Sequence, residues 1–335
     1  MGSVNIKQLA RELNLSAATV SRALRDSHEI SSATKQRVND LARKLNYEPN
    51  PSASTLRSHK SKTLAVIVPE IANNFFSLAI NGIEEVARQH GYHVLIYQSH
   101  DNVEAEASFI KSLLTGRADG ILLSVASETV NEIHLMDLNK QIPTVFFDRV
   151  PDGLNTVNVT TNDYESAYDA AEHLIESGCK KIAYLFALNN LLAGKNRLKG
   201  YLNALKDHNI DLDDHLIITC GKDDINNYSL LKDAISKYQP DGVISATEEL
   251  VLPCYEICQL LKINIPNYLK IVSFSNLKTA PFLNPSLTTV TQPAFEMGFK
   301  AASLLLKLLD NKQVEPGDAE VLNSVLIKRG STAVK

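Results

Sequence analysis

The chain has 335 residues, of which 44% are hydrophobic and 21% charged, and its formal net charge is −4. This length exceeds one small domain and predicts two or three, with the composition of a soluble globular protein. The longest apolar runs fall short of the roughly 20 residues that a membrane span needs, and the first residues lack the pattern of a signal peptide. We therefore expect a cytoplasmic protein with no membrane contact.

The charges are divided unevenly along the chain. Residues 1–62 hold 11 Lys and Arg against 5 Asp and Glu, which leaves 23 of the 34 basic and 33 of the 38 acidic residues to the rest. A basic N-terminal segment on an acidic body indicates that this segment alone binds a polyanion.

The basic segment is predicted to form three short helices. In NIKQLARELN the apolar residues recur at i, i+3, i+4 and i+7, and Asn5 with Gln8 resembles a capping box. The second helix follows Ser16, a good N-cap, through AATVSRALRD, and the third covers SATKQRVNDLARKLN. Because only two or three residues separate the first two helices, they must cross steeply, as in a helix-turn-helix.

The second helix has the side chains to read DNA. Its predicted exposed face carries small residues and arginines, namely Ala17, Ala18, Ser21, Arg22 and Arg25. Such a face can enter the major groove, where Arg22 would bind a guanine edge while Ser16, Thr19 and Ser21 contact phosphates. The helical spacing is equally compatible with a three-helix bundle that has a solvated basic face.

A Pro- and Ser-rich bridge, PNPSASTLRSHKSK, covers residues 49–62 and contains one large apolar residue, Leu56. The bridge is too short and too rich in serine to form a helix in water by itself. Leu56 has no obvious core to enter.

From Thr63 onwards, strand-like and helical stretches alternate in two series. The first series has the strands TLAVIVP, HVLIYQS, DGILLSV and PTVFFDR, and the second has TVNVT, KKIAYLFA, LIITC, DGVISAT and KIVSFSN. Near-continuous apolar strands between amphipathic helices predict parallel sheets covered on both faces. Two series predict two doubly wound α/β lobes.

Ligands of open α/β sheets bind beyond the carboxyl ends of the strands. Polar and aromatic residues occupy these positions in both series: Asn73, Phe75, Phe76, Ser124, Asp148 and Arg149, then Arg197, Thr247, Glu248, Ser275 and Asn276. Aromatic rings can stack on a sugar or base, and arginine and carboxylates can hold hydroxyls or an anion. For any one of these residues, a turn or capping role is the alternative.

The four cysteines, Cys179, Cys220, Cys254 and Cys258, include no C-x-x-C pair, which is typical of a reduced chain. Cys254 and Cys258 share a helix face, where small buried side chains are favoured over a metal or redox pair because no further ligands lie nearby. Neither G-x-G-x-x-G nor G-x-x-x-x-G-K-[ST] occurs, so we expect no cofactor, no metal and no enzyme.

The N-terminal sequence resembles the DNA-binding headpiece of the lactose-repressor (LacI/GalR) family of transcription regulators. The matching elements are L-A-x-x-L-x-x-S-x-x-T-V-S-R-x-L, I-S-x-x-T-K-x-R-V and L-N-Y-x-P-N, and the likeness continues over essentially the whole chain. The resemblance implies a homodimer that binds a double-stranded DNA operator and is switched by a small-molecule effector, a sugar or sugar derivative. A secreted solute-binding protein would share the lobes but requires a secretory signal instead of a basic headpiece.

The family architecture implies a helix-turn-helix headpiece at residues 1–48, a hinge at 49–62 and an effector-binding and dimerisation core at 63–335. Two periplasmic-binding-protein-like lobes joined by three crossovers form that core. The expected bounds are about 63–160 and 292–319 for the first lobe, and about 161–291 and 320–335 for the second. The C-terminus lacks the leucine-heptad tail of tetrameric members, so a dimer is expected.

The resemblance also implies roles for individual residues. It maps the base-reading face onto Ala17, Ala18, Ser21 and Arg22, and it makes Leu56 a wedge that each subunit of a dimer inserts into the minor groove. The residues that match effector positions are Phe75, Phe76, Ser124, Asp148 and Arg197. Where many members have Ala-Asn-Asp and Gly-Tyr-Asp-Asp, this chain has Ala246-Thr247-Glu248 and Ser273-Phe274-Ser275-Asn276. An acceptor for paired sugar hydroxyls is thereby lost, so the effector is not inferred from other members.

Overall fold

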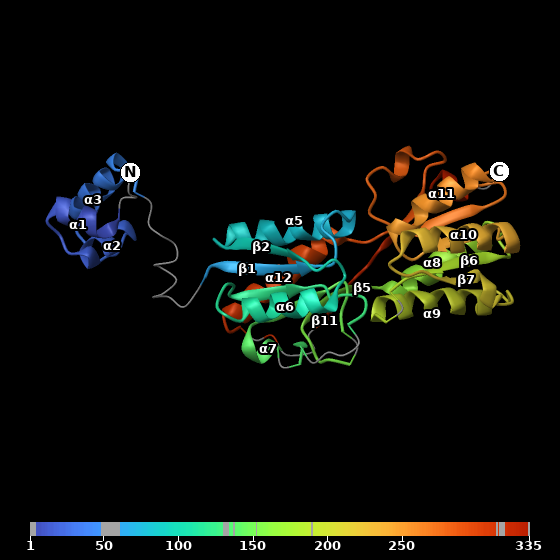
Figure 1. Cartoon of the computed structure of the whole chain (residues 1–335), viewed down its shortest axis with the longest axis horizontal. Helices are drawn as coiled ribbons and strands as arrows, with labels where there is room; N and C mark the ends of the chain where they lie inside the picture. The colour runs from blue at the N-terminus through green and yellow to red at the C-terminus, as the bar shows by residue number, and fades with distance from the viewer. Residues whose placement is uncertain are drawn as a thin grey trace. The chain divides into compact units, whose positions relative to one another are not determined.

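The computed structural model describes residues 5–47, 61–129, 134–136, 138–151, 153–188, 190–312, 314 and 319–333. The chain divides into two compact units, Met1–Ser61 and Lys62–Lys335. Figure 1 shows that the first is helical and the second is α/β. The predicted hinge residues 49–60, including Leu56, lie outside the described residues.

The helices of the N-terminal unit are α1 (Ile6–Leu13), α2 (Ala17–Leu24) and α3 (Ser32–Lys44). The side chains of Asn5, Ser16 and Ser31 each accept a hydrogen bond from the backbone N–H three residues later, which fixes where each helix begins. The predicted N-caps of the first two helices are therefore confirmed. The apolar faces meet in one core, formed by Leu9, Ala10, Leu13, Val20, Ala23, Val38 and Ala42.

Ala17 departs from its expected place on the exposed face of α2. It is half-buried and packs against the core of the unit, whereas Ala18 is exposed. Ala17 precedes the buried Val20 by three residues, and residues three apart lie on the same side of a helix. The exposed surface of α2 therefore begins at Ala18.

The first lobe of the core unit is built on a sheet with the strand order β11-β5-β4-β3-β1-β2, in which all neighbouring strands are parallel. Its strands are β1 (Thr63–Val68), β2 (His93–Gln98), β3 (Gly120–Leu123), β4 (Thr144–Phe147), β5 (Asn158–Thr161) and β11 (Ala319–Leu322). Its helices are α5 (Asn74–Gln89), α6 (Val103–Leu113), α7 (Leu138–Gln141) and α12 (Ala294–Leu309).

The second lobe repeats this plan with the strand order β12-β10-β9-β8-β6-β7. Its strands are β6 (Ile182–Phe186), β7 (Ile217–Thr219), β8 (Gly242–Ser245), β9 (Lys270–Phe274), β10 (Thr288–Thr291) and β12 (Val325–Ile327). Its α-helices are α8 (Asp163–Glu176), α9 (Leu192–Asp207), α10 (Asp224–Tyr238) and α11 (Val251–Leu260). The strands are parallel except for β12, an edge strand that runs antiparallel to β10.

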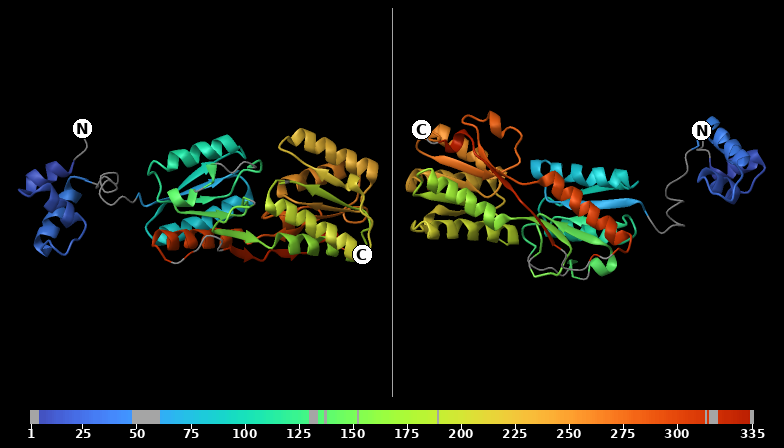
Figure 2. Two further views of the ribbon diagram at one scale, coloured as in Figure 1. Left: turned by 90° about the horizontal axis from the view of Figure 1, so that it is seen from below. Right: turned by 180° about the vertical axis from the view of Figure 1, so that it is seen from behind.

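Each sheet is covered by helices on both faces, as the strand patterns predict (Figure 2). Alternate residues of β1 divide between two cores, so that Leu64 and Val66 pack with α5 and α12, while Ile67 packs with α6 and α7. In the second lobe, Leu185 of β6 packs with α10 and α11, and Tyr184 packs with α8 and α9. The predicted fold of two doubly wound α/β lobes is thus confirmed.

The described chain crosses between the lobes near Asn162, near Gln292 and near Ser324. The first crossing anchors the third, because the Asn162 side chain accepts a hydrogen bond from the backbone N–H of Ser324 at 2.8 Å. These crossings place the carboxyl ends of the strands of one lobe opposite those of the other.

One detail of the predicted lobes is wrong. The stretch TVNVT, placed in the second series, contributes β5 to the first sheet. The final return to the second lobe, expected at about 320, follows Leu322, because Ala319–Leu322 pairs in register with Asn158–Thr161 and completes the first sheet. The core unit also begins at Lys62, one residue early, where the backbone N–H donates to the carboxylate of Asp119.

Candidate functional site

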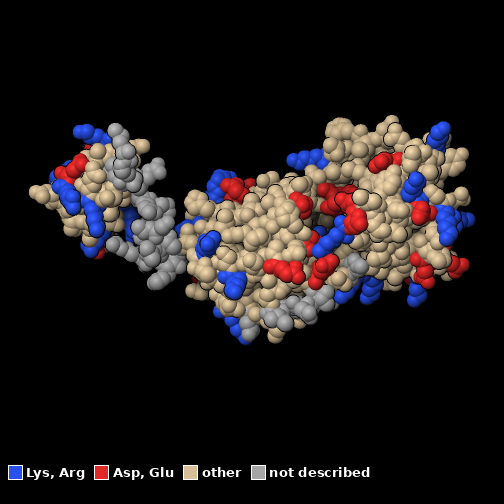
Figure 3. Space-filling view, viewed as in Figure 1, with Lys and Arg blue, Asp and Glu red and all other residues tan. Residues whose placement is uncertain are grey.

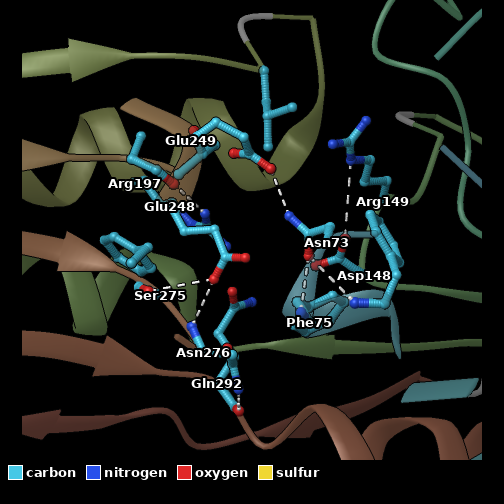
Figure 4. Close-up of a pocket in the computed structure, with 15 residues that line it drawn as sticks. Asn73, Phe75, Asp148, Arg149, Arg197, Glu248, Glu249, Ser275, Asn276 and Gln292 are labelled. Atoms are coloured by element: carbon cyan, nitrogen blue, oxygen red, sulfur yellow. Dashed lines mark hydrogen bonds and ion pairs between the residues drawn. The ribbon is translucent and has the colours of Figure 1, made fainter. Parts of the chain in front are cut away.

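A narrow cavity of about 50 Å³ lies between the lobes, at the carboxyl ends of their strands. Nearly all of the predicted ligand-binding residues line it, and these are Asn73, Phe75, Phe76, Asp148, Arg197, Thr247, Glu248, Ser275 and Asn276. Figure 4 shows Asn73, Phe75 and Asp148 facing Glu248, Ser275 and Asn276 from the opposite wall. The rule that ligands bind beyond strand ends therefore correctly grouped residues that are far apart in the sequence.

Ser124 is the exception among the predicted residues. It follows β3 as expected, but it is fully buried and lines neither this cavity nor a larger cavity beside it. Its backbone N–H donates to the carbonyl of Ile67, and its hydroxyl has no hydrogen-bond partner. Ser124 therefore belongs to the interior of the first lobe behind the cavity wall.

The cavity wall also contains Arg149, which the strand-end rule had named, and residues that the site prediction omitted: Leu188, Ala246, Glu249, Phe274 and Gln292. Gln292 follows β10, a strand that was not predicted, although the β-branched run LTTVT just before it carries a strand signal. Glu249 could have been found as the neighbour of Glu248. Ala246 follows β8 directly but has no polar or aromatic side chain, and Phe274 is the last residue of β9, so neither was selected.

Arg197 of α9 is fixed in the wall by groups of its own lobe. Its Nε donates to Asp163 Oδ1 and its Nη1 to the carbonyl of Ala246, both at 2.7 Å, and the guanidinium carbon lies 4.2 Å from the centre of the Phe274 ring. Burial opposes the charge of this side chain, but Asp163 and Asp148 outweigh burial and raise the pKa of Arg197. A permanent cation with a fixed orientation therefore faces the cavity.

Asp148 comes from the other lobe, directly after β4, and its backbone is in the left-handed region with φ 58°. Burial raises the pKa of Asp148 to about 6, although Arg149, Arg197 and a hydrogen bond from Gln292 oppose the rise. A left-handed backbone and a shifted pKa in one residue of a cavity wall are typical of a binding site.

The N-terminus of α5 supplies the aromatic part of the wall. Asn73 caps this helix by accepting hydrogen bonds from the backbone N–H groups of Phe75 and Phe76. The two rings meet edge to face, with 5.3 Å between their centres, and the guanidinium of Arg149 lies 5.6 Å from the Phe76 ring. Both rings are buried, so little of either face is open for stacking in this arrangement.

Side chains of the two lobes also bond directly across the cleft. Glu248 accepts hydrogen bonds from the backbone N–H and the side-chain amide of Asn74, at 3.1 and 3.0 Å. Glu249 accepts one from the amide of Asn73 at 2.5 Å, as Figure 4 shows. The structure therefore presents the cleft in a closed arrangement that the chain itself maintains.

A larger cavity of about 650 Å³ opens beside the first and is also lined by both lobes. Lys222 of the second lobe spans it, with Nζ 2.6 Å from the carbonyl of Asp101 and 3.3 Å from Glu128 Oε2. Arg149 donates to the carboxylate of the same Asp101 at 2.7 Å. Figure 3 shows acidic and basic side chains gathered around this hollow between the lobes.

In the N-terminal unit, α2 keeps only part of its predicted reading face free. Ala18 and Arg22 are exposed, whereas Ser21 is half-buried. The guanidinium of Arg22 donates to Glu29 at 3.0 Å, and both side chains are more than half exposed. The hydroxyls of Ser16 and Thr19 bond to each other at 2.8 Å. Arg22 and Arg25 are the long cationic side chains of the predicted face, and both are exposed.

A helix-turn-helix unit followed by a two-lobed α/β core with a polar cleft defines the class of ligand-responsive DNA-binding regulators. Residues 5–50 match the model of the bacterial regulatory proteins of the lacI family. Residues 61–331 match the model of periplasmic binding proteins and the sugar-binding domain of the LacI family. The chain belongs to the LacI family.

Characterised relatives cover almost the whole chain. Catabolite control protein A of Staphylococcus xylosus is 30% identical over 98% of this chain and 99% of its own length. The transcriptional repressor CytR of Escherichia coli strain K12 is 30% identical over 98% of this chain and 96% of its own length. Among solved structures, the lac repressor dimer bound to operator and the anti-inducer ONPF has a TM-score of 0.86, with 20% identity over 99% of both chains.

The chain is thus a transcriptional regulator with a DNA-binding domain and a sugar-binding type of core, and it is not an enzyme. Within the described part of the chain, no helix combines the length and the apolar character that a bilayer span requires. The four cysteines are free and buried, and burial raises the pKa of Cys179 to about 12 and that of Cys220 to about 11. They are small core side chains, which is the interpretation that the sequence favoured for Cys254 and Cys258.

Proposed function

We propose that this regulator represses transcription by binding a palindromic operator as a homodimer, and that a small-molecule effector in the cleft between the lobes switches it. The effector class is a sugar or sugar derivative. The observation that carries the proposal is the meeting of Arg197 from one lobe and Asp148 from the other at one cavity, with Gln292 at a crossing between them.

These polar groups suit a hydroxylated ligand. A carboxylate and a side-chain amide can accept and donate hydrogen bonds to hydroxyl groups, and a guanidinium can bind two oxygens at once. The left-handed backbone of Asp148 and of Leu188, with φ 58° and 61°, fits a site whose geometry is held for binding. Contacts from both lobes give the ligand a means of acting on their separation.

Exposed apolar side chains support the dimer. Leu95 and Ile96 are exposed on β2, the edge strand of the first sheet, where an uncovered apolar strand is a liability for a monomer. In the second lobe, Ile225 is 85% and Phe282 is 84% exposed. A twofold partner that covers these side chains would also set the spacing of two headpieces on a palindrome.

Operator reading is assigned to Ala18, Ser21 and Arg22 of α2, with phosphate contacts from Ser16 and Thr19, and Ala17 at the edge of the surface. Leu56 remains the predicted minor-groove wedge, on the resemblance alone. Replacing Leu56 by Ala should then reduce the bend of the bound operator without changing effector affinity. Gel shifts with circularly permuted operator fragments measure the bend, and an unchanged bend would refute the wedge.

The effector is sought by thermal-shift screening of the full chain against sugars, sugar acids and nucleobases, followed by calorimetry. A ligand of the cleft should raise the melting temperature of the wild type and lose affinity in Gln292→Ala. Ser124→Ala is the matched control, because Ser124 was predicted to bind but does not line the cavity. Equal loss of affinity in both variants would place the ligand elsewhere.

A further inference from the structure

The carboxylate of Glu248 has the bonding pattern of a ligand. Oε1 accepts from the backbone N–H of Asn74 at 3.1 Å and from its side-chain amide at 3.0 Å. Oε2 accepts from Ser275 Oγ at 3.3 Å and from the backbone N–H of Asn276 at 3.1 Å. Asn74 belongs to the first lobe and the other two residues to the second. One side chain therefore joins donors from both walls of the cleft.

All four groups around Glu248 act as donors, so together they form a cradle for an anion. The two backbone N–H groups can only donate. The hydroxyl of Ser275 already accepts a hydrogen bond from the backbone N–H of Leu277 at 3.1 Å, which leaves its proton for the carboxylate. Asn74 is also the first residue of α5, a helix of 16 residues whose N-terminus favours negative charge. A neutral amide in place of the carboxylate would set one N–H₂ group against these donors.

In the closed arrangement, Glu248 occupies the cradle, and the inner cavity beside it is too small for an effector. The inner cavity of about 50 Å³ holds little more than one water molecule at about 30 Å³ each, whereas ligand pockets measure roughly 300–1,000 Å³. A ligand of that size therefore does not fit between Arg197 and Asp148 unless the lobes separate, although the larger cavity of about 650 Å³ beside them is already open. Separation breaks the two bonds between Glu248 and Asn74 and opens these groups to water, whereas the bonds from Ser275 and Asn276 lie within the second lobe.

We propose that Glu248 is an intramolecular ligand, whose carboxylate occupies an anion cradle across the cleft and holds the lobes closed without effector. A carboxylate-bearing effector, such as a sugar acid, takes its place on the same four donors. This inference deepens the proposed function, since it names the chemical class for the proposed cleft. Neighbouring Glu249 is a different contact, because among the described residues its carboxylate accepts one hydrogen bond across the cleft, from the Asn73 amide.

The test uses the full chain with spin labels on both lobes, at cysteines introduced as Glu104→Cys on α6 and Asp233→Cys on α10. Both positions are exposed, whereas the native cysteines are buried. In Glu248→Ala, we expect the distance between labels to lengthen and its distribution to broaden. Sodium acetate should restore the closed distance in a saturable manner, and sodium chloride at equal ionic strength should not.

Matched variants separate the cradle from general effects. Glu249→Ala removes a carboxylate that also bridges the lobes, and its label distance should not respond to acetate. Glu248→Gln keeps the size of the side chain but removes its charge, so it should also open the cleft. Circular dichroism of this variant checks that the opening is not caused by misfolding. A closed Glu248→Ala protein, or an acetate response in Glu249→Ala as large as that in Glu248→Ala, would overturn the proposal.

The ligand class has its own comparison. Gluconate should shift the melting temperature of Glu248→Ala more than that of the wild type, because the cradle is then empty, and glucose should show no such preference. A larger shift with glucose would refute the carboxylate class. If a neutral sugar binds and loses affinity in Gln292→Ala, the carboxylate class is refuted but the proposed effector site in the cleft is supported. The two proposals can therefore fail separately.

Discussion

Asp148 lies where its surroundings oppose its negative charge. Burial raises its pKa from 3.8 to about 6, although two arginines and Gln292 pull the pKa down. The folded protein therefore holds this proton to a higher pH than the unfolded chain does. The associated stability is fully present below about pH 4 and is lost as the pH rises through about 6, by about 3 kcal/mol at roughly 1.4 kcal/mol per pKa unit.

Asp148→Asn should abolish this pH dependence. We expect its free energy of unfolding to lack the wild-type loss between about pH 4 and pH 6, so that the variant is the more stable protein at neutral pH by up to about 3 kcal/mol. Urea denaturation at several pH values measures both curves. Parallel curves would show that other carboxylates cause the loss. A charged Asp148 lowers the stability of the protein, so we infer that the residue serves ligand binding and not folding.

Arg22 is expected to carry base discrimination. Arg22→Ala should lower operator affinity by roughly 1–3 kcal/mol per subunit while leaving affinity for random DNA almost unchanged. Fluorescence anisotropy on both DNAs measures the difference. Glu29→Gln is the matched control, since it removes the ion pair at 3.0 Å but keeps the arginine. Loss of discrimination in the control as well would assign the role to the ion pair.

The sequence predicted the cleft residues well where one strand end was enough to place them. Asp148 and Glu248 each follow a buried apolar strand, so the topology of a parallel sheet put both at the cleft. Ser124 satisfies the same rule, but its side chain turns into the lobe interior, and a sequence pattern does not contain that direction. Gln292 depends on the position of a crossing, which only the packed lobes define.

Two glycines set the contact between α5 and α12 in the first lobe. A Cβ at Gly82 would collide with the carbonyl oxygen of Phe295, and a Cβ at Gly298 with that of Ala79. The helices therefore approach each other backbone to backbone. Because both obstacles are backbone atoms, a side chain at either position must push the helices apart.

Gly298→Ala should destabilise the protein by roughly 1–3 kcal/mol or more, the usual cost of overpacking. Gly221→Ala is the control, because no atom lies within 4 Å of a Cβ built there and its backbone needs no left-handed conformation. Chemical denaturation should separate the two variants clearly. Equal stabilities would mean that α12 can shift at little cost.

The alternation of strands and helices from β1 to β9 could be predicted from the sequence, but β10 to β12 were missed, and the sheet to which a short strand belongs could not be predicted. β5 and β11 have four residues each, and nothing in their pattern distinguishes the sheet before them from the sheet after them. Their place follows from pairing between residues that are about 160 positions apart. That information resides in the register of the two strands and in the side chain of Asn162, which fixes the last crossing.

Coupling between effector and operator is a property of the whole molecule. The core unit begins at Lys62, at the end of the predicted hinge, so we propose that a movement of the first lobe relative to the second acts on the hinges of the proposed dimer. A ligand shifts such an equilibrium only by contacts that differ between the two states. Contacts to both lobes, with Arg197 in one and Asp148 in the other, differ between an open and a closed cleft.

Removal of the Arg197 contact should therefore abolish the switch and spare operator binding. Arg197→Ala alone would leave Asp163 as a buried unpaired charge, at a cost of about 3–5 kcal/mol, so the paired variant Arg197→Met with Asp163→Asn is preferable. We expect this variant to bind operator as the wild type does and to ignore the effector. In the wild type, operator must change effector affinity by the same factor by which effector changes operator affinity, because the coupling free energy is shared. Calorimetry with and without operator measures the first factor, and anisotropy with and without effector measures the second. Unequal factors would mean that a further equilibrium, such as dimer dissociation, takes part. Equal affinities under all conditions would place the switch outside the cleft.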